Sequence, residues 1–383
     1  MDARVYRWKD KMQDIKFYAP CLFGIEGILA NELRHLGLRN VIAGNGSVVF
    51  EGSIDDVARC NVFLRTAERV CIVVGEFRAV TFDDLFEGVK RLHWERWIGK
   101  DDEFPVTGYS LNSTLHSVPD CQAIIKKAIV DRLAQHYGVR WFAESGPQHK
   151  IRFALFQDQV TVMLDTSGVG LHKRGYRPVS NMAPIRETLA AAIVDISRYR
   201  RVERFCDPMC GSGTFAIEAA LFASNTAPGL GRPFAAEAWM QLPANSFSSA
   251  RREALDKISN IPFEIIGYDI DRKTVALAKE NVKRAGFDGR IHIETADVKD
   301  LCLPGIKNNV IVCNPPYGER MSDRQAVREQ TKLIGRVFAA QPNCRSYVIS
   351  SSETFERDYE QKVRKKRKLY NGMIKTCLYQ YFE

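Results

Sequence analysis

The sequence predicts an α/β protein whose C-terminal half forms a mostly parallel, doubly wound sheet, preceded by two smaller α+β units. From about residue 186, expected strands and helices alternate, which is typical of parallel sheets whose strands are connected by helices. A glycine-rich loop follows the first of these strands, at residues 207–213. Residues 16–166 instead show the order strand, helix, strand twice, which is typical of small α+β units.

In the first half, apolar residues recur at helical spacing on one face of residues 24–36. Short alternating runs bounded by turn residues indicate strands, among them residues 151–156 and 159–165, which are separated by a tight turn. We expect further helices at 54–66, 82–97 and 121–137, and further strands at 47–50, 70–77 and 104–112.

The second half follows a glycine-rich, basic segment, residues 168–177, which we interpret as a boundary loop. Residues 224–260 interrupt the alternation of strands and helices as an insertion. We expect helices at 185–197, 214–223, 273–285 and 331–340, and strands at 203–206, 263–268, 290–295, 310–313, 346–350 and 378–382.

The composition excludes several classes of protein. The 383 residues are 45% hydrophobic and 26% charged, so neither a disordered chain nor a fibrous repeat fits. The longest apolar run lies within Leu189–Val194, far short of the roughly 20 residues of a membrane-spanning helix. Residues 1–15 are polar and charged, unlike a secretory signal. We therefore expect a cytoplasmic protein without a membrane partner.

The cysteines and the net charge indicate what kinds of metal site and partner to expect. The ten cysteines are scattered and form no CxxC pair, which predicts reduced thiols and no structural metal. The net charge is +9, of which +2 falls in residues 1–180 and +7 in residues 181–383. This balance permits a polyanionic partner such as a nucleic acid.

Three acids follow three successive strands of the alternating half: Asp207, Asp269 and Asp297. Asp207 opens a loop that contains Gly211 and Gly213, whose backbone can approach a ligand closely. An acid at this position suits a cationic ligand better than a pyrophosphate. S-adenosylmethionine fits, because Asp269 can accept hydrogen bonds from ribose hydroxyls and Asp297 from the adenine amine. The alternative is that these acids only cap the helices that follow, as is more expected for Asp271.

The fourth strand runs into Asn314-Pro315-Pro316-Tyr317. The prolines fix the backbone and remove two N–H donors. The Asn314 side-chain carbonyl and the Pro315 backbone carbonyl can therefore accept both hydrogens of an exocyclic NH₂ group, while Tyr317 stacks on its ring. The alternative is a proline-rich turn in which Tyr317 only packs.

These motifs, together with residues 165–177 and 183–192, resemble the bacterial ribosomal RNA guanine-N2 methyltransferases of the RlmL type. The resemblance runs from about Lys16 through nearly the whole chain. It implies a Rossmann-like class I methyltransferase domain at 167–383, preceded by a polar lead at 1–15, a ferredoxin-like domain at 16–70 and a THUMP RNA-binding domain at 71–166.

The implied reaction transfers a methyl group from S-adenosylmethionine to the N2 amine of a guanine in 23S ribosomal RNA, leaving S-adenosylhomocysteine. The implied partner is ribosomal RNA or a pre-ribosomal particle, and the enzyme is expected to be a monomer or weak homodimer. The RlmL chain carries a second catalytic module that this sequence does not, so one methylation is expected.

The resemblance and the motifs together assign candidate residues. The catalytic candidates are Asn314, Pro315, Pro316 and Tyr317. The cofactor candidates are Pro184, Glu187, Thr188, Asp207, Pro208, Cys210, Gly211, Gly213, Thr214, Asp269, Ile270, Asp297, Val298 and Asn314. The candidates for RNA binding are Lys126, Lys127, Lys173, Arg174, Arg177, Lys365 and Lys366, with Arg132 and Arg140 beside the first two.

Several alternatives stay open at this point. The basic loop 173–177 either contacts the RNA backbone or packs between domains. The run 362–368 is either a solvated face or an RNA contact, and the insertion 224–260 either covers the cofactor or contacts RNA. The protein as a whole could instead methylate guanine N2 in tRNA or adenine N6 in a nucleic acid, or bind RNA without catalysis. A nicotinamide dehydrogenase lacks support, since no proton-relay constellation lies near the glycine loop.

Overall fold

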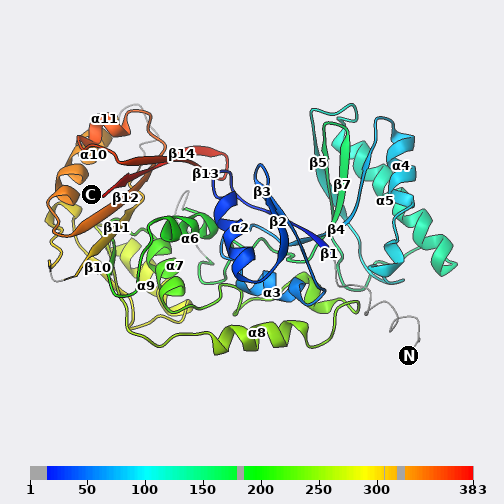
Figure 1. Ribbon diagram of the computed structural model, residues 1–383, viewed down its shortest axis with the longest axis horizontal. Helices are drawn as coiled ribbons and strands as arrows, with labels where there is room; N and C mark the ends of the chain where they lie inside the picture. The colour runs from blue at the N-terminus through cyan, green and yellow to red at the C-terminus, as the bar shows by residue number, and fades with distance from the viewer. Residues whose placement is uncertain (1–14, 179–184, 306, 317–323, 383) are drawn as a thin grey trace.

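The computed structural model describes residues 15–178, 185–305, 307–316 and 324–382. Within these residues the strands form two seven-stranded sheets. The molecule is elongated, with the sheet of the C-terminal half at one end and the N-terminal sheet reaching from the middle to the other end (Figure 1). None of the described helices is both long and apolar enough to cross a lipid bilayer.

The N-terminal sheet is continuous across both predicted α+β units. Strand β1 pairs with β4 through Phe17 and Ile72 and through Tyr18 and Cys71, so the two units share backbone hydrogen bonds. The order across the sheet is β2-β3-β1-β4-β7-β6-β5, and only the β5–β6 pair is parallel among the described pairs. The strands are β1 (Ile15–Pro20), β2 (Arg39–Ala43), β3 (Ser47–Gly52), β4 (Cys71–Arg78), β5 (Val106–Leu111), β6 (Ile151–Phe156) and β7 (Gln159–Asp165).

Four helices accompany this sheet, and their ends follow local rules. Helix α4 begins at a capping box between Thr81 and Asp84, and α5 ends at Gly138, whose φ of 66° needs a glycine. The expected helix 82–97 is too long: α4 ends at Lys90, and the chain turns so that the buried Trp94 indole donates to the Val89 carbonyl at 2.8 Å. The helices are α2 (Glu26–His35), α3 (Asp56–Phe63), α4 (Phe82–Lys90) and α5 (Val118–Tyr137).

The C-terminal sheet has the order β10-β9-β8-β11-β12-β14-β13. Its first five strands are parallel, and β14 and β13 are antiparallel to their neighbours. Strand β8 lies between β9 and β11, so the order reverses there and the carboxyl ends flank a crevice suited to a ligand. The strands are β8 (Arg204–Asp207), β9 (Glu264–Asp269), β10 (His292–Thr295), β11 (Asn309–Cys313), β12 (Cys344–Ser350), β13 (Lys365–Asn371) and β14 (Ile374–Tyr381).

Helices cover both faces of this sheet, as a doubly wound fold requires (Figure 1). Helices α6 and α7 lie on the side facing the N-terminal half, and α10 and α11 on the outer side. The expected helix 331–340 begins earlier, at Arg324. The helices are α6 (Glu187–Ile196), α7 (Thr214–Ala223), α8 (Ser246–Asp256), α9 (Arg272–Arg284), α10 (Arg324–Ala339) and α11 (Phe355–Tyr359).

The basic run 362–368 leads into a strand that the sequence reading missed. Strand β13 pairs with β14 through a two-residue turn, Gly372-Met373. Gly372 has a φ of 64°, and a glycine at this position is the signal of a type II′ hairpin turn. The lysine-rich composition concealed the strand, because lysine is depleted in strands.

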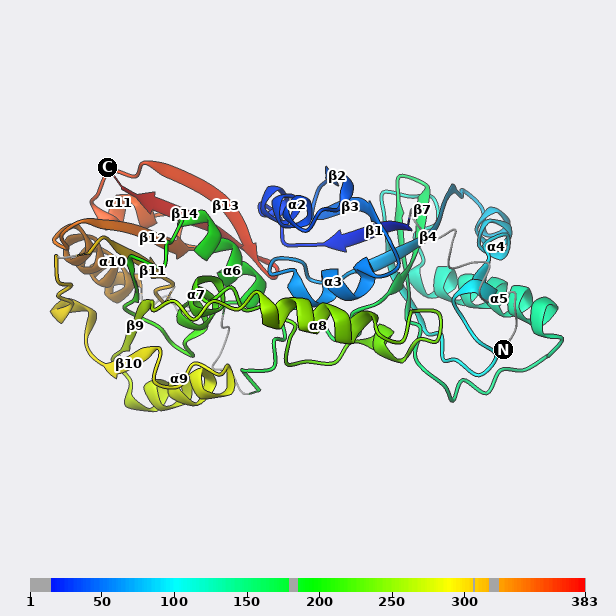
Figure 2. The same cartoon turned by 60° about the horizontal axis from the view of Figure 1, so that its bottom comes forward.

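The insertion 224–260 joins the two halves of the molecule. Its helix α8 packs along α3 of the N-terminal half, where Arg59 pairs with Glu253 at 2.9 Å (Figure 2). Further along, the Trp239 ring stacks on His149 with centroids 4.4 Å apart. The insertion therefore holds the methyltransferase half against both N-terminal units.

Candidate active site

Four candidate side chains follow four neighbouring parallel strands of the C-terminal sheet. In spatial order, Asp297 follows β10, Asp269 ends β9, Asp207 ends β8, and Asn314 follows β11. Because these strands are parallel, their carboxyl ends share one edge of the sheet. The structure therefore places the three acids and Asn314 at one edge of the sheet, as the sequence predicts.

The glycine loop between β8 and α7 is tied to the neighbouring strand. The Cys210 amide donates to the Tyr268 carbonyl at 2.7 Å, and the Gly211 amide donates to Asp269 Oδ2 at 3.0 Å. Gly211 and Gly213 have φ values of 52° and 80°. A Cβ atom added at Gly211 would meet no other atom within 4 Å, so the loop is open there to a ligand.

Asp207 lies almost completely inside the protein, with 1% of its surface exposed. Its Oδ1 accepts a hydrogen bond from the Met209 amide at 3.3 Å. Burial raises the pKa of Asp207 well above its usual range, and the neighbouring charge of Asp269 raises it further. A cationic ligand group would stabilise the ionised form of this carboxyl.

Asp269 is held in place by two backbone amides. Besides the Gly211 amide on Oδ2, its Oδ1 accepts from the Asp271 amide at 3.0 Å. Each oxygen keeps a second lone pair, so the carboxylate can still accept two hydroxyl groups. The next residue, Ile270, is 69% exposed and offers an apolar side chain beside this carboxylate.

A cavity of about 190 Å³ lies beside Asp297. Its walls combine the largely apolar side chains of Pro208, Tyr268 and Val298 with the carboxylates of Asp297 and Asp300. Tyr268 and Ala296, which also line it, were not predicted, although each directly precedes one of the strand-end acids.

Some of these acids do cap the helical turns that follow them, as the alternative interpretation expects. Asp271 caps α9 through the Lys273 amide at 3.0 Å, as expected for this acid. Asp297 also caps a short turn, through the Lys299 amide at 3.0 Å, yet it borders the cavity at the same time. Hydrogen bonds from Lys299 lower the pKa of Asp297, so this carboxylate is ionised and able to accept an amine.

The catalytic candidates begin directly at the end of β11, whose five residues are all buried. Asn314 is half-buried, Pro315 is buried and Pro316 is exposed, so the motif passes from the sheet to the surface within three residues. Two further candidates, Tyr317 and Pro184, lie outside the described residues.

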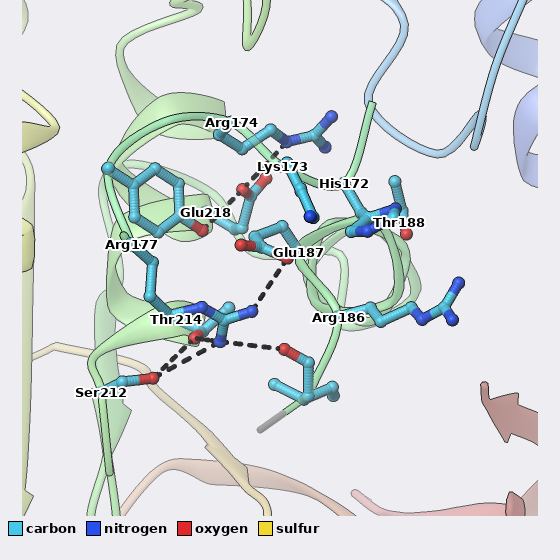
Figure 3. Close-up of polar contacts among 12 residues, drawn as sticks. His172, Lys173, Arg174, Arg177, Arg186, Glu187, Thr188, Ser212, Thr214 and Glu218 are labelled. Carbon is cyan, nitrogen blue, oxygen red and sulfur yellow. Dashed lines mark hydrogen bonds and ion pairs between the residues drawn. The ribbon is translucent and has the colours of Figure 1, made fainter. Parts of the chain in front are cut away.

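Arg177 connects the cofactor loop to the start of α6 (Figure 3). Its guanidinium lies 2.9 Å from Glu187 Oε2 and donates to Thr214 Oγ1 at 2.9 Å and to the Ile185 carbonyl at 3.2 Å. The side chains of Arg177 and Glu187 are only 8% and 5% exposed. Burial raises the pKa of Glu187, and Arg177 opposes that rise. The Arg177 side chain therefore supports the loop from inside the protein.

Arg174, another candidate for RNA binding, is also buried. It donates to the Leu171 carbonyl at 2.7 Å and lies 3.4 Å from Glu218, which also accepts from the Tyr176 hydroxyl at 3.0 Å (Figure 3). It reaches the Arg65 carbonyl of the N-terminal half as well. Of the two readings of loop 173–177, interdomain packing is right for Arg174, while Lys173 is exposed.

Thr188 was expected to contact the cofactor, but its hydroxyl lies in the junction between the halves. It is fully buried and donates to Glu68 Oε1 at 2.5 Å. Glu68 also pairs with Arg186 and His172, each at 2.9 Å. Burial alone would raise the pKa of Glu68, but hydrogen bonds from His172 and Thr188 lower it. Sequence reasoning missed Glu68, since a single acid after a helix carries no motif.

Some of the remaining candidates for RNA binding form ion pairs with carboxylates, and others do not. Lys126 pairs with Glu144 at 2.7 Å, and Arg132 pairs with Glu95 at 2.6 Å. Lys366 pairs with Glu356. Those that stay exposed without a carboxylate partner among the described residues are Lys127, Arg140, Lys173 and Lys365.

The described residues fit S-adenosylmethionine. Asp207 would face a positive group, Asp269 the ribose hydroxyls, and Asp297 with the cavity the adenine ring and its amine. Gly211 leaves room for the chain between them. Among the described residues, no cluster of His, Cys, Asp or Glu is arranged to hold a metal ion. The fold and this site define a class I methyltransferase that uses S-adenosylmethionine.

Comparisons with known proteins specify the family. Three family models match the chain: the RlmL ferredoxin-like domain at residues 16–71, the THUMP domain at 79–165 and the RMKL-like methyltransferase domain at 174–380. The chain therefore belongs to this family of methyltransferases, in which a ferredoxin-like and a THUMP domain precede the catalytic domain.

Comparisons with individual proteins support the same family. The chain is 44% identical over 374 residues to the putative RNA methyltransferase YpsC of Bacillus subtilis, covering 97% of each chain. It is 33% identical to a ribosomal RNA large subunit methyltransferase K/L of Syntrophotalea carbinolica, covering 95% of this chain and 53% of that one. The chain thus spans about half the length of the K/L relatives.

A solved structure described as SMU.472, a putative methyltransferase complexed with SAH, superimposes with a TM-score of 0.91. It is 39% identical and covers 97% of this chain and 98% of its own. The bound product in a structure so similar agrees with the cofactor that the site defines here.

Proposed function

We propose that this protein transfers a methyl group to the exocyclic N2 amine of a guanine in 23S ribosomal RNA, within the cytoplasm. The observation that carries the proposal is the position of Asn314. It follows β11, the strand beside β8, whose end forms the cofactor loop. An amine held at Asn314 therefore lies beside the bound cofactor. The K/L relatives, named for the large ribosomal subunit, support the choice of RNA.

S-adenosylmethionine supplies the methyl group from its sulfonium, and the electron pair of the broken S–C bond stays on sulfur. Asn314 Oδ1 and the Pro315 carbonyl accept the two N–H groups of the amine. This grip turns the nitrogen lone pair out of conjugation with the base and toward the methyl carbon, where the new N–C bond forms. The methylated nitrogen then loses its proton to water. Orientation and electrostatics supply the catalysis, and no strong base is needed.

Asn314→Ala tests the proposal. We expect transfer of labelled methyl to ribosomal RNA to fall by about 100-fold or more, in line with the loss of one fixed polar group that stabilises a transition state. Binding of S-adenosylmethionine, measured by calorimetry, is expected to weaken far less than methyl transfer, because Asp207, Asp269 and Asp297 follow β8, β9 and β10 and stay in place.

Two variants make the result specific. Asn314→Asp keeps an acceptor oxygen and is expected to retain more activity than Asn314→Ala. Asn260→Ala removes an exposed asparagine before β9 and is expected to behave as the unmodified protein. Undiminished methyl transfer by Asn314→Ala would refute the assigned role of Asn314.

A further inference from the structure

A second groove opens at the opposite edge of the catalytic sheet from Asn314. Its volume is about 1360 Å³, and it lies between α2 of the N-terminal half and the end of α6, β13 and β14. Residues that precede the parallel strands also line it, among them Glu203 before β8 and Asn308 before β11. Six cationic side chains line the groove: Arg34, Arg198, Arg345, Lys362, Lys365 and Arg367.

Few carboxylates balance these cations. Only Asp195 and Glu203 line the groove among its described residues. Glu203 is engaged with Arg345, at 2.9 and 3.0 Å. Within the described part of the chain, Arg198, Lys362 and Lys365 are exposed and form no ion pair. Like charges gathered in a concave surface repel one another, and a polyanion relieves that repulsion.

The strand geometry directs this charge into the groove. Lys365 and Arg367 alternate with Lys366 along β13 and therefore share the face opposite to it. Lys366 pairs with Glu356 on that other face. Arg367 also donates to the Gly24 carbonyl at 2.9 Å, which fixes β13 beside the N-terminal half. In both views β13 runs next to α2 (Figures 1 and 2). The groove is thus a product of the domain arrangement.

We propose that this groove binds the phosphodiester backbone of the RNA substrate. The inference rests on RNA being the substrate and adds where its backbone is held. The groove exceeds the roughly 300–1,000 Å³ of ordinary small-molecule pockets, and its unpaired cations suit a chain of phosphates. On α5, Lys126 and Arg132 are paired with carboxylates, which leaves Lys127 as the exposed cation of that helix with no carboxylate partner among the described residues.

The groove and the active site lie at the two ends of the same strand. Asn308 lines the groove and Asn314 begins the catalytic motif, so the length of β11 separates them, about 20 Å at about 3.3 Å per residue. An RNA segment extending along this distance would have its backbone held at one edge of the sheet and its target base presented at the other.

The test compares two triple variants. The first combines Arg198→Gln, Lys362→Gln and Lys365→Gln in the groove. The second combines Lys279→Gln, Lys283→Gln and Arg284→Gln, which are exposed cations of α9 without ion pairs among the described residues. Both remove three charges. Binding of a fluorescein-labelled 30-nucleotide single-stranded RNA is measured from 50 to 200 mM KCl, with melting temperature and cofactor binding as checks of the fold.

We expect the groove variant to bind this RNA about tenfold more weakly at 50 mM salt, and to lower the slope of log K against log salt by about 2. The α9 variant is expected to stay near the unmodified protein. In methylation assays the groove variant should raise KM and leave kcat unchanged.

The inference is overturned if the groove variant binds RNA with the affinity and salt slope of the α9 variant, as it would if the groove served an acidic protein instead. A groove variant that loses RNA affinity, in a protein whose label does not enter guanine, would uphold the groove and refute the proposed target.

Discussion

Asp207 has a buried carboxyl group and lies at the start of the cofactor loop. These two features have opposite effects on its protonation state. Burial favours the protonated acid and raises its pKa well above the usual range. A positive group on the cofactor favours the carboxylate. Binding of the cofactor is therefore coupled to ionisation of Asp207.

Asp207→Asn tests this coupling. Because the folded-state pKa is raised, the protonated form stabilises the fold, and that stability is lost as pH rises through the folded-state pKa. Asparagine resembles the protonated acid, so we expect an equal or higher melting temperature at neutral pH, together with cofactor binding weaker by about tenfold or more. Calorimetry and thermal melting measure both.

The pH profile provides the control. In the unmodified protein, cofactor affinity is expected to rise with pH as Asp207 ionises, whereas the affinity of the asparagine variant stays flat over the same range. Equal affinities at every pH would mean that Asp207 does not face the cofactor.

The sequence predicted the acids and glycines of the site because each belongs to a local pattern, a strand end followed by a helix start. The contacts that Arg174 and Thr188 make in the structure were not predicted, because they are not local in the sequence. Their partners, Glu218 and Glu68, lie 44 and 120 residues away in the chain. Whether a cationic side chain is exposed or buried depends on such distant partners, so its exposure cannot be predicted from the neighbouring sequence.

At the level of helices and strands, the packing of the insertion between α7 and β9 also depends on residues far away in the sequence, so it could not be predicted from a local pattern. Its helix α8 finds its partner, α3, nearly 200 residues earlier in the chain: Arg59 and Glu253 are 194 residues apart. Strand β13, by contrast, carried a local signal in Gly372 and could have been predicted from its hairpin turn. The alternating strands and helices of the catalytic half were predicted because each has its own period.

Trp239→Ala tests the role of the insertion. Trp239 is 3% exposed, stacks on His149, and donates its indole N–H to the Gln148 carbonyl at 3.0 Å. We expect a loss of about 3 kcal/mol of stability, the usual cost of truncating a buried tryptophan. The THUMP unit should also become separable from the remainder, visible as a second transition in scanning calorimetry.

Trp141→Ala serves as the matched control, because Trp141 is 77% exposed and is expected to leave melting unchanged. If Trp239→Ala also melted in a single transition at the unmodified temperature, the insertion would not hold the THUMP unit in place.

At the scale of the whole molecule, the fold class and the three kinds of domain were predicted correctly from the sequence and its resemblance to the family. How the domains are arranged in space was not predicted. One cluster of buried apolar side chains runs through both halves, from Phe17 and Trp94 to Phe215. The N-terminal half is nearly neutral, with a net charge of +2 over residues 1–180. In the assembled molecule, Arg34 of this half lines the same groove as five cations of the C-terminal half.

The most direct test of the central claim is nucleoside analysis of ribosomal RNA methylated by the whole protein. Ribosomal RNA from a strain that lacks this protein is incubated with the purified protein and methyl-labelled S-adenosylmethionine, then digested to nucleosides. We expect the label to enter N2-methylguanosine from 23S RNA. Label in N6-methyladenosine, or only in tRNA added to the same reaction, would contradict it.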